Sequence, residues 1–366
     1  MKPEQPKYLL IKNSILARIQ EGELTVGTQI PSINEIMEQF GVSKVTAVRA
    51  MAELEMEGAV RREHGRGTFV TGMSKTTPFP RGPKRVALLV PDMSNPFNVE
   101  VVRSLEKSLR EAGLVVELSC SDYQPETERE LFSALISNQH LAGIVLISAG
   151  VDQMGIDPAS IRTPLVVIDS CPEDLLEKCV FINCDHYKGG YDAAVHLASH
   201  GHREIGYVDW YAATKTRLEG FRRGLQDFRV DLPERRIISV GPGKPIGADL
   251  MDFVGREKLT ALFAVNDMLA MQAMQLLRAG GYRIPQDISL MGYDDVMAAR
   301  YLEVPLTTVE QHEEQIGRKA AEFLLERLDG RPGSLRPREV LIMPRVVERD
   351  STGAPRAAAS LDAAAS

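Results

Sequence analysis

Hydrophobic and polar positions follow two different patterns along the chain, and the pattern changes near residue 84. In the first part, apolar residues recur at helical spacing over short stretches, which predicts amphipathic helices. The first predicted helix is Tyr8–Gln20, and its buried face consists of Leu9, Ile11, Ile15, Leu16 and Ile19.

After residue 84, short apolar runs alternate with helical stretches. The runs VALLV, VVELSC and GIVLI come first, and the alternation restarts at Ile205–Val208, Ala261–Ala264 and Ile288–Gly292. Strands that alternate with helices are typical of a parallel, doubly wound sheet. The second part is therefore predicted to be an α/β domain with two lobes.

A proline-rich segment separates the two parts. Thr71–Lys84 contains Pro78, Pro80 and Pro83, and prolines at this spacing exclude a helix and favour an extended linker. We therefore expect a first domain over residues 1–70, a linker over 71–84 and a two-lobed domain over 85–350. The end, STGAPRAAASLDAAAS, is low-complexity sequence, which predicts a disordered tail over 351–366.

The first domain contains the signature of a winged helix-turn-helix. Ser32 and Glu35 have the spacing of a capping box at the start of a second helix, which ends near Gly41. Ser43 is placed to cap a third helix that runs to about Glu57. Two helices joined by a glycine-containing turn form a helix-turn-helix. The segment AVRREHGRGTFV adds a glycine-rich hairpin with basic residues at its tip, which predicts the wing.

Charge and composition narrow the class of protein. The net charge of −7 divides into +2 over residues 1–83 and −9 over the remainder, so only the first domain is suited to nucleic acid. No apolar run is long enough to span a membrane, and the N-terminus has neither a signal-peptide nor a transit-peptide pattern. We therefore expect a cytoplasmic protein without a membrane partner. The four cysteines contain no CxxC pair, which predicts free thiols.

The third helix is predicted to enter the major groove of DNA with its N-terminus first. The backbone amides and the hydroxyl at that end can hold a phosphate, and side chains on the early turns can reach base edges. The wing is placed to enter the minor groove. The residues that carry this prediction are Ser43, Lys44, Thr46 and Arg49 on the helix and His64 and Arg66 on the wing. The alternative is a helix-turn-helix that serves only as a protein contact, which the wing disfavours.

Residues 8–70 resemble the winged helix of the gluconate-repressor (GntR) family over its whole length. The matching motifs run from EGEL through IPS, FGVS and ELEMEGAV to GRGTFV. The resemblance implies contacts to DNA from Ser32, Lys44, Thr46, His64 and Gly65. Asn34 stands at a position where the family usually has arginine. Val48 stands at a position where the family often has a second arginine. The loss of two cations is expected to weaken phosphate contacts or to change the DNA sequence that is read.

In the second domain, polar residues follow the predicted strands at the edge where α/β sheets bind ligands. Carboxylates, amides and an arginine can form hydrogen bonds with adjacent hydroxyl groups, and an aromatic ring can pack on the apolar face of a sugar. The residues are Asp92, Asn95, Phe97, Asp169, Arg217, Asn266, Asp267, Asp294 and Asp295. Each one taken alone is also compatible with a helix cap, above all Asn266 or Asp267.

Residues 84–350 resemble the effector domain of lactose- and galactose-repressor regulators, whose fold is that of periplasmic sugar-binding proteins. HGHREIGYV and NDMLAM…GYDD carry most of the resemblance. It implies that Arg217, Asn266, Asp294 and Gln311 line a cleft, with Asp92, Asn95, Phe97 and Asp169 on the facing lobe. It also implies chain crossings near Asn183, Val309 and Gly330. Lobe 1 would then comprise about 85–182 and 310–330, and lobe 2 about 183–309 and 331–350.

One segment departs from these relatives. Where some of them offer an aromatic residue between two helices of lobe 2, this chain has GPGKPIG, and Trp210 or Tyr211 is a candidate to replace its stacking role. The glycine spacing of GPGKPIG misses both nucleotide-binding fingerprints, so we expect no nucleotide there.

The expected fold is thus α/β: a winged helix-turn-helix followed by a two-lobed, doubly wound, periplasmic-binding-protein-like domain. This pairing resembles the arabinose repressors of bacilli. The expected function is a homodimeric transcription regulator, a repressor released from operator DNA by a small neutral sugar or polyol. A transport-type sugar-binding protein is the alternative. GxSxG, HExxH and metal-spaced His/Cys motifs are missing from the sequence, so we expect no enzyme, metal or cofactor.

Overall fold

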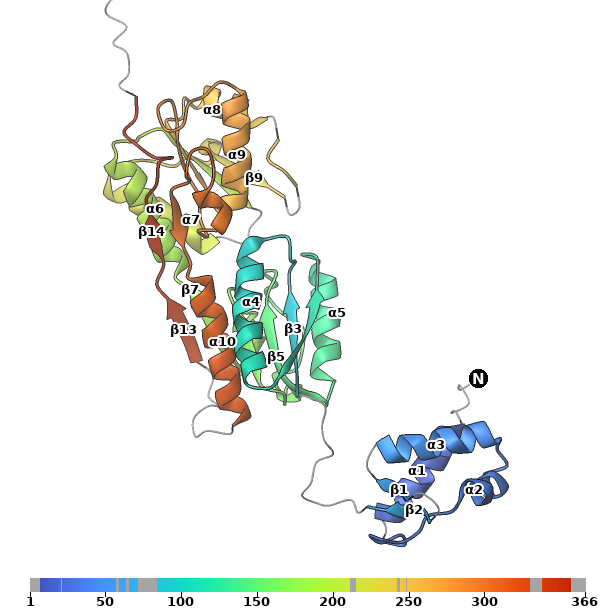
Figure 1. Ribbon diagram of the computed structural model, residues 1–366. Coiled ribbons are helices and arrows are strands. Elements are labelled where there is room, and N and C mark those ends of the chain that lie inside the picture. The colour runs from blue at the N-terminus through green and yellow to red at the C-terminus, as the bar shows by residue number, and fades with distance from the viewer. Residues whose placement is uncertain are drawn as a thin grey trace, which may run out of the picture. The chain divides into compact units, whose positions relative to one another are not determined.

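The computed structural model describes residues 7–20, 22–56, 59–63, 66–71, 84–210, 215–241, 244–247, 249–329 and 338–356. The chain divides into two compact units, Met1–Gly82 and Pro83–Ser366 (Figure 1). Most of the predicted linker, the wing residues His64 and Gly65, and Tyr211 lie outside the described residues. In the described part of the chain, no helix has both the length and the apolar character that a membrane span requires.

The first unit is the predicted winged helix. Its elements are α1 (Lys7–Gln20), α2 (Ile33–Phe40), α3 (Lys44–Met56), β1 (Val60–Glu63) and β2 (Gly67–Val70). The capping box is confirmed: the Ser32 amide donates to the Glu35 carboxylate at 2.7 Å, and the Glu35 amide donates to the Ser32 hydroxyl at 3.3 Å. Gly41 ends α2 in the left-handed region with a φ of 60°. The antiparallel pairing of β1 with β2 confirms the wing.

Lobe 1 of the second unit is built on a six-stranded sheet. In spatial order its strands are β13 (Arg338–Ile342), β7 (Cys179–Cys184), β6 (Leu165–Ile168), β5 (Leu141–Ile147), β3 (Arg85–Val90) and β4 (Val115–Cys120), all parallel to their neighbours. Helices α4 (Pro96–Glu111) and α10 (Glu313–Leu328) cover one face, and α5 (Pro125–Ile136) covers the other (Figure 1). Along β3, Val86 and Leu88 join one core while Ala87 and Leu89 join the other. Both faces are therefore buried, which explains the continuous apolar run VALLV.

Lobe 2 is built on a four-stranded parallel sheet. In spatial order its strands are β11 (Ser289–Met291), β10 (Ala261–Ala264), β8 (Ile205–Trp210) and β9 (Ile237–Val240). Its helices are α6 (His186–Ser199), α7 (Lys215–Asp227), α8 (Asp249–Arg256) and α9 (Asp267–Ala279). Helices α6 and α7 pack so closely that a Cβ on Gly220 would collide with the carbonyl oxygen of Tyr187, so this position requires glycine. This close approach holds the start of α7 next to the start of α6.

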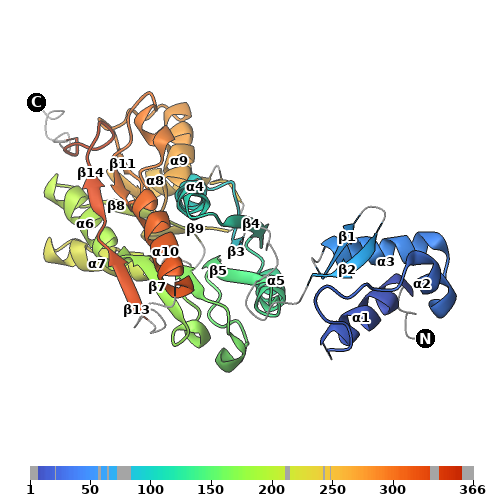
Figure 2. The same ribbon diagram turned by 60° about the horizontal axis from the view of Figure 1, so that its bottom comes forward.

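The chain crosses between the lobes three times. It leaves lobe 1 between β7 and α6, returns between β12 (Thr308–Glu310) and α10, and leaves again between β13 and β14 (Arg345–Val347). Strands β12 and β14 pair antiparallel, and Figure 2 shows β14 running on from β13. The first two crossings lie where the resemblance implied. The prediction for the third was wrong, because β13 continues the lobe 1 sheet beside β7 before the chain turns into lobe 2 at Met343 and Pro344.

The predicted boundary of the tail was also wrong. Residues 351–356 belong to the folded domain, while 357–366 lie outside the described residues. Ser351 is fully buried, accepts a hydrogen bond from the Thr307 amide at 2.8 Å and donates one to the Leu290 carbonyl at 2.6 Å. A serine in low-complexity sequence satisfies two backbone groups here, which its local sequence does not reveal. The four cysteines are free, as predicted.

Candidate functional site

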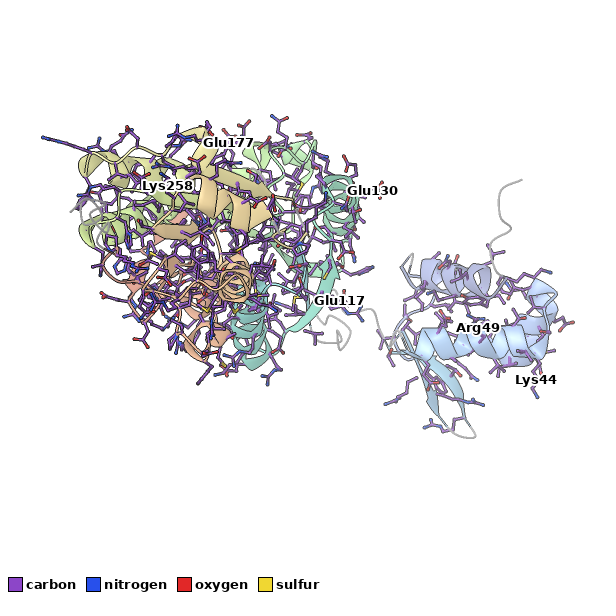
Figure 3. The ribbon with its side chains drawn as sticks, turned by 90° about the horizontal axis from the view of Figure 1, so that it is seen from above. Lys44, Arg49, Glu117, Glu130, Glu177 and Lys258 are labelled. Atoms are coloured by element: carbon purple, nitrogen blue, oxygen red, sulfur yellow. The ribbon has the colours of Figure 1, made fainter. Side chains whose placement is uncertain are left out.

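The open face of α3 carries the helix residues predicted to meet DNA. Lys44 and Arg49 are exposed on this helix and are labelled on it in Figure 3. Val45 and Val48 are also exposed, at 79% and 42%, whereas Ala47 and Ala50 are fully buried against the rest of the winged helix. The buried alanines fix which face of α3 is available, and the predicted Lys44 and Arg49 lie on it.

Several of the residues predicted to contact DNA also form contacts within the winged helix. The Ser43 hydroxyl lies 3.0 Å from the Thr46 hydroxyl and accepts from the Thr46 amide at 3.4 Å, so it caps α3. The Arg49 guanidinium lies 3.9 Å from the centre of the Tyr8 ring and 3.9 Å from the Glu53 carboxylate. Arg66 is exposed in the turn directly before β2. Ser32 serves the capping box of α2, so its predicted DNA contact depends on the part of its hydroxyl that the box leaves free.

In lobe 1, the predicted ligand residues follow β3. Asn98 donates to the Asp92 carboxylate at 3.2 Å, and Ser94 also donates to that carboxylate. The Asn95 side chain accepts from the Phe97 amide at 3.0 Å, so it caps α4. Phe97 is buried in the core under α4. The cap interpretation is therefore correct for Asn95, and Asp92 is the carboxylate that this loop presents.

Asp169 connects lobe 1 to lobe 2. Its φ of 73° turns the chain sharply after β6, and its carboxylate accepts from Nε2 of His186 at 2.8 Å. Nη2 of Arg217 donates to Nδ1 of the same ring at 3.0 Å, which requires the imidazole proton to sit on Nε2. Although burial raises the pKa of Asp169, the hydrogen bond from His186 and the charge of Arg217 hold it below its ordinary value. The carboxylate is therefore ionised at neutral pH.

Arg217 is held in lobe 2 by two further contacts. It donates to the Val265 carbonyl, and its guanidinium lies 3.5 Å from the centre of the Tyr293 ring. The Tyr293 hydroxyl lies 3.4 Å from Nδ1 of His186. Nε of Arg217 nevertheless has no hydrogen-bond partner, although only 6% of the residue is exposed. This buried donor is fixed in place and unsatisfied.

Asp294 and Gln311 present the matching acceptors. Asp294 has a φ of 119°, and its Oδ1 accepts from Nε2 of Gln311 at 2.6 Å. Oδ2 of Asp294 and Oε1 of Gln311 have no hydrogen-bond partner, although both residues are 3% exposed. Burial raises the pKa of the Asp294 carboxyl well above its ordinary value, Asp267 adds to the shift, and Arg217 opposes it. We call Asp92, Asp169, Arg217, Asp294 and Gln311 the strand-end cluster.

Comparisons with known proteins agree with this division of the chain. Residues 7–70 match the family described as bacterial regulatory proteins, gntR family, and residues 194–352 match the periplasmic binding protein-like domain. The chain is 33% identical over 282 residues to the HTH-type transcriptional regulator DegA of Bacillus subtilis, covering 73% of this chain and 80% of that protein. The chain belongs to the bacterial helix-turn-helix transcriptional regulators.

Two further relatives bear on the regulator's second unit. The regulator is 29% identical over 364 residues to the arabinose metabolism transcriptional repressor of Geobacillus stearothermophilus, covering 95% of this chain and 98% of that one. Its fold matches the crystal structure of a LacI family transcriptional regulator from Enterococcus faecium with bound ribose. That match has a TM-score of 0.62 and 26% identity, and it covers 74% of this chain and 99% of that one. Both relatives are transcription regulators.

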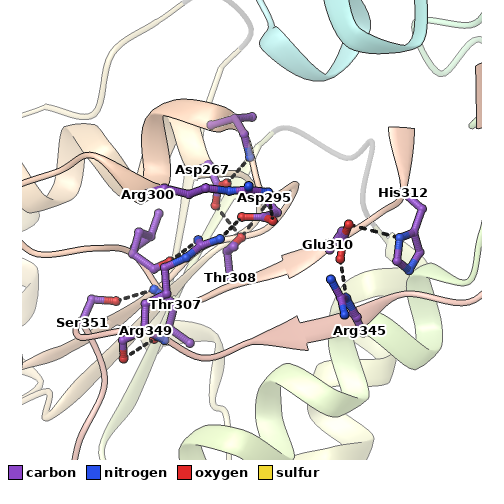
Figure 4. A network of polar contacts seen from close by, with 12 residues as sticks. Asp267, Asp295, Arg300, Thr307, Thr308, Glu310, His312, Arg345, Arg349 and Ser351 are labelled. Carbon is purple, nitrogen blue, oxygen red and sulfur yellow. Dashed lines mark hydrogen bonds and ion pairs between the residues drawn. The ribbon is translucent and has the colours of Figure 1, made fainter. Parts of the chain in front are cut away.

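The remaining predicted carboxylates hold the regulator's fold together. The Asp267 carboxylate accepts from Thr308 at 2.6 Å and from the Val296 amide at 2.9 Å (Figure 4). Asp295 pairs with Arg300 at 2.9 Å and with Arg349. All of their partners lie in lobe 2 or in the strands beside it, so these two carboxylates fix the backbone on either side of Asp294.

Asn266 caps α9 by accepting from the Leu269 amide at 2.8 Å, as the cap interpretation predicted. Sequence reasoning missed His186 and Tyr293, which join Asp169 to Arg217. Tyr293 directly precedes Asp294 in the GYDD motif, so its position was available as a signal. His186 follows β7, a strand that the sequence analysis did not identify, because its sequence CVFINC contains the polar Asn183.

Proposed function

We propose that this regulator is a homodimeric repressor that binds operator DNA through its winged helix and releases it when a small neutral sugar or polyol binds at the strand-end cluster. The observation that carries the proposal is the set of unsatisfied buried polar atoms: Nε of Arg217, Oδ2 of Asp294 and Oε1 of Gln311. A buried group without a hydrogen bond costs about 1–3 kcal/mol, which a ligand can recover.

The donors and acceptors of the cluster suit hydroxyl groups. A hydroxyl donates one hydrogen bond and accepts others, so a polyol can satisfy the Arg217 donor and the Asp294 and Gln311 acceptors together. Asp92 and Asp169 bring further carboxylates to the same strand ends and disfavour an anionic ligand such as a sugar phosphate. The arabinose repressor of Geobacillus stearothermophilus and the ribose-bound LacI-type regulator support a pentose-sized ligand.

Thermal-shift screening of the intact protein tests the ligand class. The panel contains pentoses, hexoses and polyols, with hypoxanthine, guanine and sugar phosphates as competing classes. A neutral sugar at a concentration of 100 times its Kd stabilises the folded state by about 2.7 kcal/mol. Calorimetry on each hit then gives its affinity. Tight binding of a purine or a sugar phosphate, with no binding of any neutral sugar, contradicts the proposal.

The dimer is tested on DNA. One winged helix covers one half-site, so a rigid dimer needs two half-sites separated by whole helical turns of about 10 bp each. The operator is first obtained by selection from random DNA. Inserting five base pairs between its half-sites rotates one of them by half a turn and is expected to weaken binding strongly, while inserting ten restores the rotation. Equal affinity for the operator with the five-base-pair insertion contradicts a rigid dimer.

A further inference from the structure

One pair of aromatic rings joins the two lobes next to the strand-end cluster. Tyr123 lies in the loop after β4 of lobe 1, and Trp210 is the last residue of β8 in lobe 2. Their ring centres are 5.1 Å apart and their planes are inclined by 58°. The other ring pairs in the described part of the chain connect residues of lobe 2 alone. This pair is therefore sensitive to the separation of the lobes.

Tyr123 is anchored to the ligand-facing loop of lobe 1. Its φ of 55° lies in the left-handed region, and its amide donates to the Pro91 carbonyl at 3.3 Å. Burial, followed by the charge of Asp92, raises the pKa of its hydroxyl well above the ordinary value, and the side chains of Asn98 and Asn95 oppose the shift. The phenol is therefore neutral, and its polar end lies beside the residues that hold Asp92.

Trp210 is anchored from the other side. Strand β8 lies between β9 and β10 in the sheet, with Trp210 in register with Val240. Trp210 is half-buried against the lobe 2 core, which leaves part of its indole available to the partner ring. Neither anchor depends on the other lobe. If the lobes separate, Tyr123 stays with lobe 1 and Trp210 stays with lobe 2, and the contact between their rings is lost.

We propose that Tyr123 and Trp210 form an aromatic gate whose contact is made when the lobes close on a sugar and is broken when they open. This inference rests on the proposed function, because the gate closes on the ligand of the strand-end cluster. The gate raises ligand affinity through ring–ring contact that only the closed form possesses. An aromatic pair of this kind corresponds to about a two- to tenfold effect on affinity.

The sequence provides a direct reporter, since Trp210 is the single tryptophan of the chain. Acrylamide quenching of its fluorescence measures how accessible the indole is. In the intact protein, saturating sugar is expected to reduce the quenching, because closure places the Tyr123 ring against the indole. Y123F keeps the ring and is expected to keep both the protection and the affinity. Y123A is expected to lose the protection and to bind sugar about two- to tenfold more weakly.

Two controls separate the gate from a general effect of substitution. Tyr301 is 80% exposed, and Y301A removes a ring of the same kind without touching the lobe interface, so it should behave like the unmodified protein. Operator binding and the circular dichroism of each variant show that it is folded. If Y123A does not fold, the quenching of the unmodified protein and of Y123F still decides the question, because both retain the ring.

The outcomes distinguish the gate from the function on which it rests. If calorimetry shows sugar binding but sugar leaves the quenching of Trp210 unchanged, the gate is wrong and the proposed function stands. Equal sugar affinity of Y123A and the unmodified protein also overturns the gate. If no neutral sugar binds by calorimetry, the proposed function and the gate fail together.

Discussion

The two units of this regulator place their predicted functional residues in opposite environments. In the winged helix, Lys44 and Arg49 are exposed. In the second unit, which we call the sensor unit, Arg217, Asp294 and Gln311 are almost completely buried. DNA is a polyanion met at a surface, and exposed cations bind its phosphates without rearrangement of the protein. A small ligand is bound by fixed groups shielded from water. Substitutions should therefore act locally in the winged helix and couple to folding in the sensor unit.

The largest expected effect is on the buried cluster. Asp294→Ala and Arg217→Ala each remove a hydrogen-bonding partner of the sugar, and the bond from Arg217 is charge-assisted, so its loss costs roughly 1.5–3 kcal/mol, or about ten- to a hundredfold in affinity. Calorimetry with the best sugar from the screen measures the loss. Arg222→Ala is the matched control for Arg217, since it lies on the same helix α7 and pairs with Glu234 at the surface. A sugar affinity within twofold of the original for both cluster variants contradicts the assignment.

A smaller effect is expected on the open face of α3. Lys44→Ala should weaken operator binding by about tenfold or less and reduce the slope of log affinity against log salt by about 0.9, if Lys44 neutralises one phosphate. Sugar affinity should stay unchanged. Lys107→Ala also removes an exposed helical lysine, but from α4 of the sensor unit, and should leave DNA affinity unchanged. Fluorescence anisotropy over a range of salt concentrations measures both quantities. Equal losses in DNA and sugar affinity would show that the two roles are not separate.

The comparison also predicts different responses to acid. Burial, followed by the charge of His200, lowers the pKa of His196 to about 4, and its Nε2 lies 2.9 Å from the Thr352 hydroxyl. An unfolded histidine titrates near 6.5, so the unfolded state takes up the proton first as the pH falls. The stability of the sensor unit is therefore expected to decrease between about pH 6.5 and pH 4. His64, outside the described residues, is the single histidine of the winged-helix unit.

Thermal unfolding of the full chain from pH 7 to pH 4 checks this difference. His196→Gln keeps a side chain that can reach the Thr352 hydroxyl but does not titrate, so the melting temperature of the sensor unit should fall less steeply with pH in this variant. The same pH slope in both proteins would mean that His196 does not contribute to the acid sensitivity.

The smallest effect is expected from adding a cation to the winged helix. Val48 is 42% exposed, beside Lys44 and Arg49 on the open face of α3. Val48→Arg should strengthen DNA binding severalfold at low salt and steepen the salt dependence by about one phosphate contact. Filter binding at two salt concentrations is sufficient to detect the change. An unchanged slope would show that this position does not face a phosphate.

The sequence predicted the elements of the winged helix well because each has a local cause. The Ser32–Glu35 capping box and the left-handed Gly41 fix the ends of α2 whatever the rest of the chain does. The strands β3, β5, β8 and β10 were also predictable, because a strand buried on both faces is continuously apolar. Their polar strand ends then located most of the strand-end cluster.

The missed features depend on tertiary contacts. His186 and Tyr293 acquire their roles only when β7 and β11 bring them to Arg217, and neither residue type is distinctive on its own. From the sequence, β13 was assigned to lobe 2, and only its pairing with β7 shows that it belongs to the sheet of lobe 1. Asp295 and Asp294 are adjacent in sequence, yet one forms ion pairs while the other keeps an unsatisfied oxygen. Only the three-dimensional arrangement separates the carboxylate with a structural role from the one that keeps an unsatisfied oxygen.

The central claim is that the exposed surface of the winged helix and the buried cluster of the sensor unit are energetically coupled. The most direct test is calorimetric titration of the sugar into the intact protein with and without saturating operator DNA. A coupling free energy of about 1–3 kcal/mol corresponds to a five- to 150-fold change. We expect operator DNA to weaken sugar binding by the same factor by which the sugar weakens operator binding. Identical sugar affinity in the two titrations would contradict the account.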